Sequence, residues 1–267
     1  MDSVTSGDGT RIAFERRGDG PPLVLVHGTA IDHHVWDRVS PDLAEQFTVY
    51  AMDRRGRGES GDAADYAIER EFEDVVAVAA AADGPVTLLG HSYGAVCAIG
   101  AAPRVSGLEQ LVLYEPPLWV EGRTRVPDSV IDRMEAAADR DGQAANERIL
   151  ELFFEEVAES PERLEAIRSS PNYDRHVAAA AKLPRELRGR EGYRPTPDTY
   201  PTVSVPTTLL LGTETPAALA RSTEAAADLF PDSQIEHLPG QGHGAMYTAP
   251  DLLTATLTSV LGGGSEA

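Results

Sequence analysis

The sequence predicts an α/β protein in which a mainly parallel sheet is covered by helices on both faces. Short, nearly continuous apolar runs recur along the chain, and such runs are typical of strands that are buried on both faces. They alternate with stretches of helical periodicity, and this alternation indicates a parallel sheet with helical crossovers. At 267 residues and 42% hydrophobic, the chain is long and apolar enough for one large core with an insertion.

Eight strands are expected, and the first two form a hairpin. Asp8-Gly9 separates them and is a type I′ turn signal. A helical stretch at 36–45 lies between the third and fourth strands, and a helix at 68–82 precedes the fifth. The expected strands are residues 4–7, 11–16, 23–26, 48–51, 86–89, 111–114, 207–211 and 235–238.

The region between the sixth and seventh strands follows a helical pattern throughout. An all-helical block inserted into a parallel sheet is typical of a cap over the carboxyl edge, where ligands bind in such folds. The chain is therefore divided into an α/β core of residues 1–115 and 201–261, a helical cap of residues 116–200 and a flexible tail of residues 262–267. Pro184 would break or kink the last cap helix. The expected cap helices are 129–139, 144–158, 161–168 and 174–188.

Charge and composition disfavour several classes of partner. The formal net charge is −20, with 43 acidic and 23 basic residues, so nucleic acid and anionic membranes are poor partners. No run of eighteen apolar residues is present, so no membrane span is expected. The first residues lack the basic and apolar regions of a signal peptide, and the single cysteine, Cys97, can form no internal disulfide. A cytoplasmic protein is expected.

The most informative motif is Gly90-His91-Ser92-Tyr93-Gly94, a G-x-S-x-G pattern between an apolar strand and a run of small residues. That order predicts a buried strand, a tight turn and a packed helix. The glycines let the strand and the helix approach closely, and the serine is held in a strained conformation. Its hydroxyl then stands at the N-terminal end of a helix, where negative charge is favoured. Ser92 is therefore the candidate nucleophile.

Two further loops carry candidate catalytic groups. His27-Gly28-Thr29 follows the third strand, and the backbone N–H of Thr29 can pair with that of Tyr93 as an oxyanion hole. Gly240-Gln241-Gly242-His243-Gly244 follows the last strand. A histidine in such a mobile, glycine-rich loop can swing over Ser92.

These motifs, in this order, resemble the α/β-hydrolase family over nearly the whole chain, from the first hairpin to about Leu261. The likeness includes the H-G loop, the elbow, the helical insertion and the D-x-x-G-x-G-x-S loop at residues 53–60. By that resemblance Ser92 is the nucleophile and His243 the general base, and no metal or organic cofactor is implied. An aspartate at the elbow would imply an epoxide hydrolase or a dehalogenase, and the serine argues against both.

The acid of the triad departs from the family pattern. The family places an aspartate after the strand that follows the cap, in a G-x-x-D pattern, but Thr215 holds that position here. Glu115 directly follows the sixth strand, which should lie beside the elbow strand, and it is the expected acid. Zearalenone-type lactonases likewise carry a glutamate at that place and lack the aspartate. Glu214 is the alternative acid, since it lies one residue early but is one methylene longer.

Sequence pattern defines the substrate pocket less well. Aromatic side chains at the candidate positions are equally common in plain core. His33 and His34 are adjacent, and neighbouring histidines on a helix face different directions, so no metal site is expected. The candidate pocket walls are Trp36, Trp119, Phe153 and Met246.

The prediction is a serine hydrolase that cleaves a small carboxylic ester or lactone through an acyl-enzyme intermediate. Because fold does not fix chemistry, two alternatives stand beside it. The same triad could hydrolyse a thioester or a carbon–carbon bond, or carry out cofactor-free perhydrolysis. A ligand receptor with little turnover could also retain the scaffold. The pattern fixes neither the substrate nor the oligomeric state.

Overall fold

The computed structural model describes residues 1–118, 126–140, 142–157, 161–196 and 203–262. Within them eight strands form one sheet in the order β1-β2-β4-β3-β5-β6-β7-β8. β2 pairs antiparallel with β1 and with β4, and the other pairings are parallel, so the predicted fold class is confirmed. The strands are β1 (Asp2–Thr5), β2 (Arg11–Arg17), β3 (Pro22–Val26), β4 (Thr48–Met52), β5 (Val86–His91), β6 (Leu108–Tyr114), β7 (Thr207–Gly212) and β8 (Ser233–Leu238).

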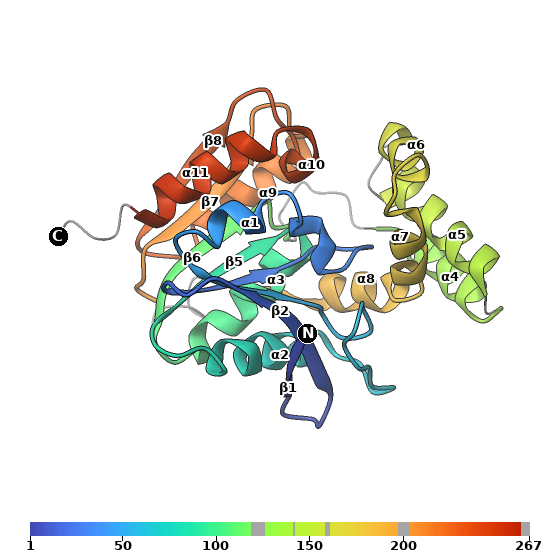
Figure 1. The fold of residues 1–267 in the computed structure, drawn as a ribbon. Coiled ribbons are helices and arrows are strands. Elements are labelled where there is room, and N and C mark those ends of the chain that lie inside the picture. The colour runs from blue at the N-terminus through green and yellow to red at the C-terminus, as the bar shows by residue number, and fades with distance from the viewer. Residues whose placement is uncertain (119–125, 141, 158–160, 197–202, 263–267) are drawn as a thin grey trace.

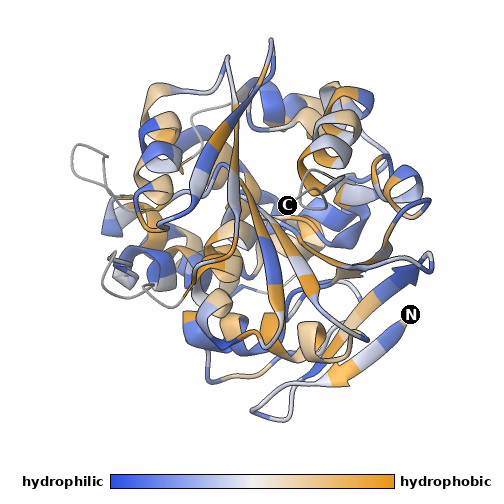
Figure 2. Ribbon diagram, turned by 90° about the vertical axis from the view of Figure 1, so that its left-hand side faces the viewer, coloured by the Kyte–Doolittle hydropathy of each residue, from blue (hydrophilic) through white to orange (hydrophobic). Residues whose placement is uncertain are grey.

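The sheet is buried on both faces, which explains why its central strands are apolar at nearly every position. Side chains alternate along β3, so Val24 and Val26 join one apolar cluster while Leu23 and Leu25 join another. Figures 1 and 2 show the helices on either side of the sheet and the hydrophobic residues gathered on its central strands. The first face is covered by α2 (Ile68–Ala80), α3 (Tyr93–Ala101) and α9 (Ala217–Ala227), and the second by α1 (Ser40–Leu43), α10 (Ala245–Thr248) and α11 (Pro250–Gly262).

The first hairpin is present, but its turn differs from the prediction. A type I′ turn needs a positive φ at both central residues. Gly9 has a φ of 89°, whereas Asp8 is not among the residues with positive φ. The N–H of Gly9 donates to the carbonyl of Ser6 at 2.9 Å, so the turn is formed by residues 6–9. The Asp8 carboxylate accepts a hydrogen bond from the N–H of Thr10 at 2.9 Å.

Between β6 and β7 the described chain contains helices and no strand. These helices share an apolar cluster that includes Ile131, Ile149 and Leu183, and Ala30 of the core joins it. Figure 1 shows most of this helical insertion to one side of the sheet, with α8 next to the core. The helices are α4 (Asp128–Ala138), α5 (Gln143–Leu152), the π-helix η3 (Phe153–Val157), α6 (Pro161–Arg168), α7 (Tyr173–Ala180) and α8 (Leu183–Gly192).

Prolines divide two of the predicted helices. The stretch at 36–45 is a 3₁₀ helix, η1 (His33–Trp36), followed by α1, and Pro41 lies in the first turn of α1. The stretch at 174–188 forms α7 and α8, with Pro184 in the first turn of α8. Both breaks arise because proline lacks the N–H that a helix interior needs, whereas the first turn does not need it.

The C-terminal helix extends further than the sequence indicated. Gly262, the first residue of the predicted tail, ends α11, and residues 263–267 lie outside the described part of the chain. Within the described ranges, every helix is too short or too polar to span a membrane.

A buried ion network joins the insertion to the core. Arg54, in the loop after β4, donates to both carboxylate oxygens of Glu71 on α2, at 2.9 and 3.1 Å, and to Glu186 on α8. Arg57 donates to the same Glu186 oxygen at 2.6 Å. These side chains are at most 1% exposed, so α8 is held to the core by ion pairs that are shielded from water. The guanidinium of Arg54 also lies 4.4 Å from the centre of the Tyr93 ring, next to the elbow.

Removing the charge of Glu186 tests whether this ion network stabilises the protein. The Glu186→Gln variant leaves two buried arginines with less compensation, and we expect a loss of about 3–5 kcal/mol in the free energy of unfolding. The matched control is Glu135→Gln, which breaks an exposed pair with Arg188 and should cost about 0–1 kcal/mol. Urea unfolding measures both. Equal losses in the two variants would contradict the role assigned to the network.

Candidate active site

β5 runs directly into α3 through the predicted elbow. Ser92 stands at the turn with φ 54° and ψ −124°, a backbone conformation that non-glycine residues rarely adopt. The N–H of Ser92 donates to the carbonyl of Tyr114 at 2.9 Å, which fixes the turn against β6. Tyr93 begins α3, so its N–H has no acceptor within the helix. The structure therefore places the predicted nucleophile on strained backbone at a helix N-terminus.

Glycines make the elbow possible through close approach. A Cβ at Gly94 would lie 2.2 Å from the carbonyl oxygen of Val26, so α3 starts directly against the end of β3. A Cβ at Gly28 would lie 2.9 Å from the Cβ of Ser92. The loop of residues 27–29 thus packs against Ser92 through Gly28, and the oxyanion role of the Thr29 N–H stays a prediction.

Glu115 and His243 meet at the carboxyl edge of the sheet. The Nδ1–H of His243 donates to Oε2 of Glu115 at 2.7 Å. The other carboxylate oxygen accepts from the N–H of Gly212 at 2.9 Å and from the hydroxyl of Thr215. The Glu115 side chain is 0% exposed and that of His243 is 22% exposed. With Nδ1 used as the donor, Nε2 of His243 is left to accept a proton.

The two acids that the sequence left open are placed very differently. Glu214 is exposed, and its carboxylate forms no hydrogen bond with another described residue; its backbone N–H donates to the carbonyl of Gln241 at 2.8 Å. Thr215, which stands where the family pattern has aspartate, uses its hydroxyl to hold Glu115. The structure thus brings Glu115, and not Glu214, to His243.

Two side chains fix the loop that carries His243. The Nε2–H of His91 donates to the carbonyl of His243 at 3.0 Å, and the hydroxyl of Tyr114 donates to the carbonyl of Gly242. The Tyr114 oxygen also accepts from the N–H of Ala245 at 3.2 Å. Burial, together with the neighbouring His243, lowers the pKa of His91 well below its usual value. His91 is therefore neutral and serves as a positioning donor.

Backbone strain is concentrated at this edge. Within the described chain, the non-glycine residues with positive φ are Ala30 at 59°, Ser92 at 54° and Glu115 at 47°. They follow β3, β5 and β6, three adjacent strands. The carbonyl of Ala30 accepts from the Nδ1–H of His176 on α7 at 2.6 Å, so the insertion contacts the loop that carries Thr29. Strain of this kind costs on the order of 1–3 kcal/mol per residue and is typical of functional sites.

The residues predicted to line the pocket differ in how deeply they are buried. Trp36 and Met246 are 1% and 0% exposed and belong to the apolar cluster between the sheet and α11. Phe153, on η3, is partly buried and meets Phe154 edge-to-face with ring centroids 5.1 Å apart. Trp119 lies outside the described residues. Packing accounts for the burial of Trp36 and Met246, and contact of any of the four with substrate stays a prediction.

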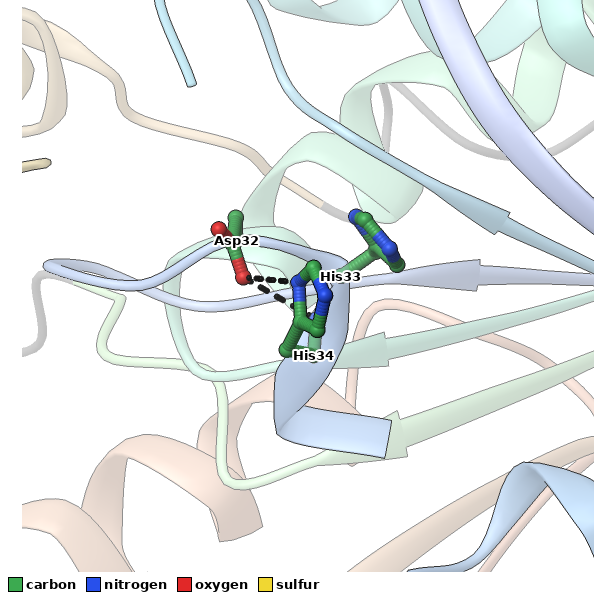
Figure 3. A group of neighbouring side chains, drawn as sticks. All are labelled: Asp32, His33 and His34. Atoms are coloured by element: carbon green, nitrogen blue, oxygen red, sulfur yellow. Dashed lines mark hydrogen bonds and ion pairs between the residues drawn. The ribbon is translucent and has the colours of Figure 1, made fainter. Parts of the chain in front are cut away.

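Asp32, His33 and His34 form a cluster after β3, shown in Figure 3, in which one ligand atom of each lies within 4.8 Å of the others. The Nδ1 atoms of both histidines and the carboxylate of Asp32 already have partners. His33 Nδ1 lies 2.7 Å from Asp53 Oδ1, and His34 Nδ1 lies 2.9 Å from Asp32 Oδ1. Arg175 on α7 donates to Asp32 at 3.1 Å, which puts a guanidinium where a cation would be needed. The cluster is therefore explained as a second contact between the insertion and the core, formed by Arg175 and Asp32.

Two features beside the site were not anticipated from the sequence. The Arg54–Glu186 pair joins residues 132 positions apart, so no local pattern indicates it. Arg163, on α6, reaches the loop after β8, because a Cβ at Gly244 would lie 3.8 Å from its Cζ. Its helix is polar and also carries the exposed Arg168, so nothing in the local pattern separates the two arginines. Only the fold shows that one of them faces the core.

With this geometry in place, comparison with known proteins identifies the class. The sequence profile described as "Alpha/beta hydrolase family" matches residues 23–256. The chain therefore belongs to the α/β-hydrolase family and is an enzyme with hydrolase activity.

Relatives and solved structures agree with that assignment. N-formylmaleamate deformylase of Pseudomonas putida is 38% identical over 130 residues, which is 47% of this chain and 48% of the relative, so that match spans about half of each. A pimeloyl-(acyl-carrier protein) methyl ester esterase of Stenotrophomonas maltophilia is 30% identical over 95% of this chain and 98% of the relative. An alpha/beta hydrolase from Sphaerobacter thermophilus has a TM-score of 0.86 at 32% identity, covering 97% of this chain and 100% of that one. A thermophilic esterase from Thermogutta terrifontis has a TM-score of 0.72 at 27% identity, covering 99% of each chain.

The contact between His176 and Ala30 predicts a pH-dependent stability. Burial lowers the pKa of His176 to about 4, against about 6.5 in an unfolded chain. The unfolded state therefore binds the proton first, and this stabilisation is present above pH 6.5 and is lost as the pH falls towards 4. In His176→Asn the side-chain amide can still donate to the Ala30 carbonyl but does not titrate.

We expect the free energy of unfolding of His176→Asn to fall less than that of the wild type between pH 7 and pH 4.5, by about 2 kcal/mol. Urea unfolding at the two pH values gives the comparison. The same fall in both proteins would contradict a neutral, buried His176.

Proposed function

We propose that the protein is a serine hydrolase that cleaves a small carboxylic ester, open-chain or cyclic, through an acyl-enzyme intermediate. In this proposal Ser92 is the nucleophile, His243 the general base and Glu115 the acid that orients it. The observation that carries the proposal is the 2.7 Å hydrogen bond from His243 Nδ1 to the buried Glu115 carboxylate. It supplies the orientation that a serine nucleophile needs from its histidine.

The reaction follows from the protons that these groups hold. His243 Nε2 takes the proton of the Ser92 hydroxyl as Oγ attacks the substrate carbonyl, and the backbone N–H groups of Thr29 and Tyr93 bind the oxyanion. The imidazolium then gives this proton to the leaving alcohol, and the acyl-enzyme remains. His243 next deprotonates a water molecule that attacks the acyl group, and it returns the proton to Ser92 as the acid leaves. The steps need no metal or organic cofactor.

The surroundings of Glu115 support its role as the acid. A carboxylate that stays ionised in the interior needs hydrogen-bond donors. Glu115 has donors from Gly212, Thr215 and His243, so its negative charge is balanced and directed at the imidazole. Thr215 then replaces the usual aspartate by a hydroxyl that supports an acid on the neighbouring strand.

The relatives favour an ester as the substrate class. Two of the proteins compared are named esterases, and one of these is a methyl ester esterase. The helical insertion of residues 116–200 is proposed to serve as a cap over the carboxyl edge, consistent with the contact of α7 with Ala30.

A fluorophosphonate probe together with an ester panel tests the function. We expect the probe to label Ser92 with a mass shift that is lost in Ser92→Ala, and we expect turnover of short p-nitrophenyl esters or lactones. Tight ligand binding without labelling or turnover would favour a receptor instead. Labelling with turnover of thioesters or carbon–carbon substrates alone would overturn the ester assignment and keep the nucleophile.

A further inference from the structure

Arg163 places a positive charge beside the proposed catalytic histidine. It lies on α6, and a Cβ at Gly244 would lie 3.8 Å from both its Cζ and its Nη2. Gly244 directly follows His243, so the guanidinium stands over the loop that carries the base. The side chain is partly buried, so part of it remains open to solvent.

In the part of the chain that the structure describes, no carboxylate forms an ion pair with Arg163. Arg163 forms no ion pair or hydrogen bond there, and the groups that its charge acts on include Tyr247, Tyr114 and Glu115 as well as His91 and His176. Both oxygens of Glu115 are already occupied by other donors. Burial lowers the pKa of Arg163, because the charged form loses water and the nearby Tyr247, Tyr114 and Glu115 offset this loss only in part.

The buried arginines Arg54 and Arg55, in contrast, form ion pairs with carboxylates. Arg54 donates to Glu71 and Glu186, and Arg55 donates to Asp74 at 2.7 Å. In a chain of net charge −20 acidic residues are abundant, yet none of those described forms an ion pair with Arg163, and Glu115 acts on it only through its charge. A guanidinium whose N–H groups have no described protein partner is available to bind an anion, and its fork geometry suits a carboxylate.

We propose that Arg163 binds a free carboxylate of the substrate, so that the enzyme acts on small esters that carry a negative charge close to the scissile carbonyl. The class includes half-esters of short dicarboxylic acids. This inference rests on the proposed function and specifies its substrate. The local cation also offsets the repulsion that the acidic protein as a whole exerts on an anion.

The test compares the monomethyl and dimethyl esters of succinate and glutarate. We expect kcat/KM to favour the monomethyl esters, and we expect Arg163→Met to reduce this preference by about 10- to 100-fold, chiefly through KM. The matched control is Arg168→Met, on the same helix but exposed and paired with Glu151, which should leave the preference unchanged. A preference that does not change in Arg163→Met, or no preference in the wild type, would overturn the proposal.

Binding without turnover separates this inference from the proposed function. In Ser92→Ala we expect calorimetry to detect glutarate, and we expect Arg163→Met or Arg163→Gln in that background to abolish the signal. If the wild type cleaves no ester but this binding is found, the proposed function fails and the carboxylate site stands. If esters are cleaved but glutarate does not bind, the carboxylate site fails and the proposed function stands. Because Arg163 has no partner among the described residues, neither replacement should lower the melting temperature.

Discussion

The hydrogen bond between Nδ1 of His243 and the carboxylate of Glu115 joins two parts of the core that the helical insertion separates in sequence. Glu115 follows β6 before the insertion, and His243 follows β8 after it. The bond forms only if β6, β7 and β8 lie in register, because Gly212 at the end of β7 donates to the same carboxylate. The pairing of these strands therefore determines whether Glu115 and His243 meet, and the proposed chemistry depends on that contact.

That constraint is reinforced by strained and tightly packed backbone. Ala30, Ser92 and Glu115 have positive φ at the ends of adjacent strands, and such strain persists only where surrounding structure holds it. The core supplies that support through strands buried on both faces. The insertion adds to it, since His176 bonds to Ala30 and Glu186 reaches the arginine that stacks on Tyr93. The contacts between insertion and core thus lie close to the groups that the proposed reaction uses.

The sequence predicted those features that local patterns determine. Apolar runs located the strands, and the Gly90–Gly94 motif located the elbow with Ser92 at its turn, because each follows from neighbouring residues. The choice between Glu115 and Glu214 stayed open, since both follow strands that end at the same edge and only side-chain direction separates them. The break at Pro184 was predicted and is confirmed, whereas the one at Pro41 was not, because periodicity alone extends that helix. Arg163 could not be found, because its significance lies in what surrounds it in space, which is a property of the fold.

The most direct test of the account is the kcat of Glu115→Gln measured beside that of Glu214→Gln on one ester. Glutamine keeps the size of each side chain and removes its charge, and thermal unfolding checks that both variants are folded. We expect a loss of about 10⁴-fold for Glu115→Gln, as for other triads that lose their acid, and little change for Glu214→Gln. Near wild-type turnover in Glu115→Gln, with Glu214→Gln inactive, would contradict the central claim.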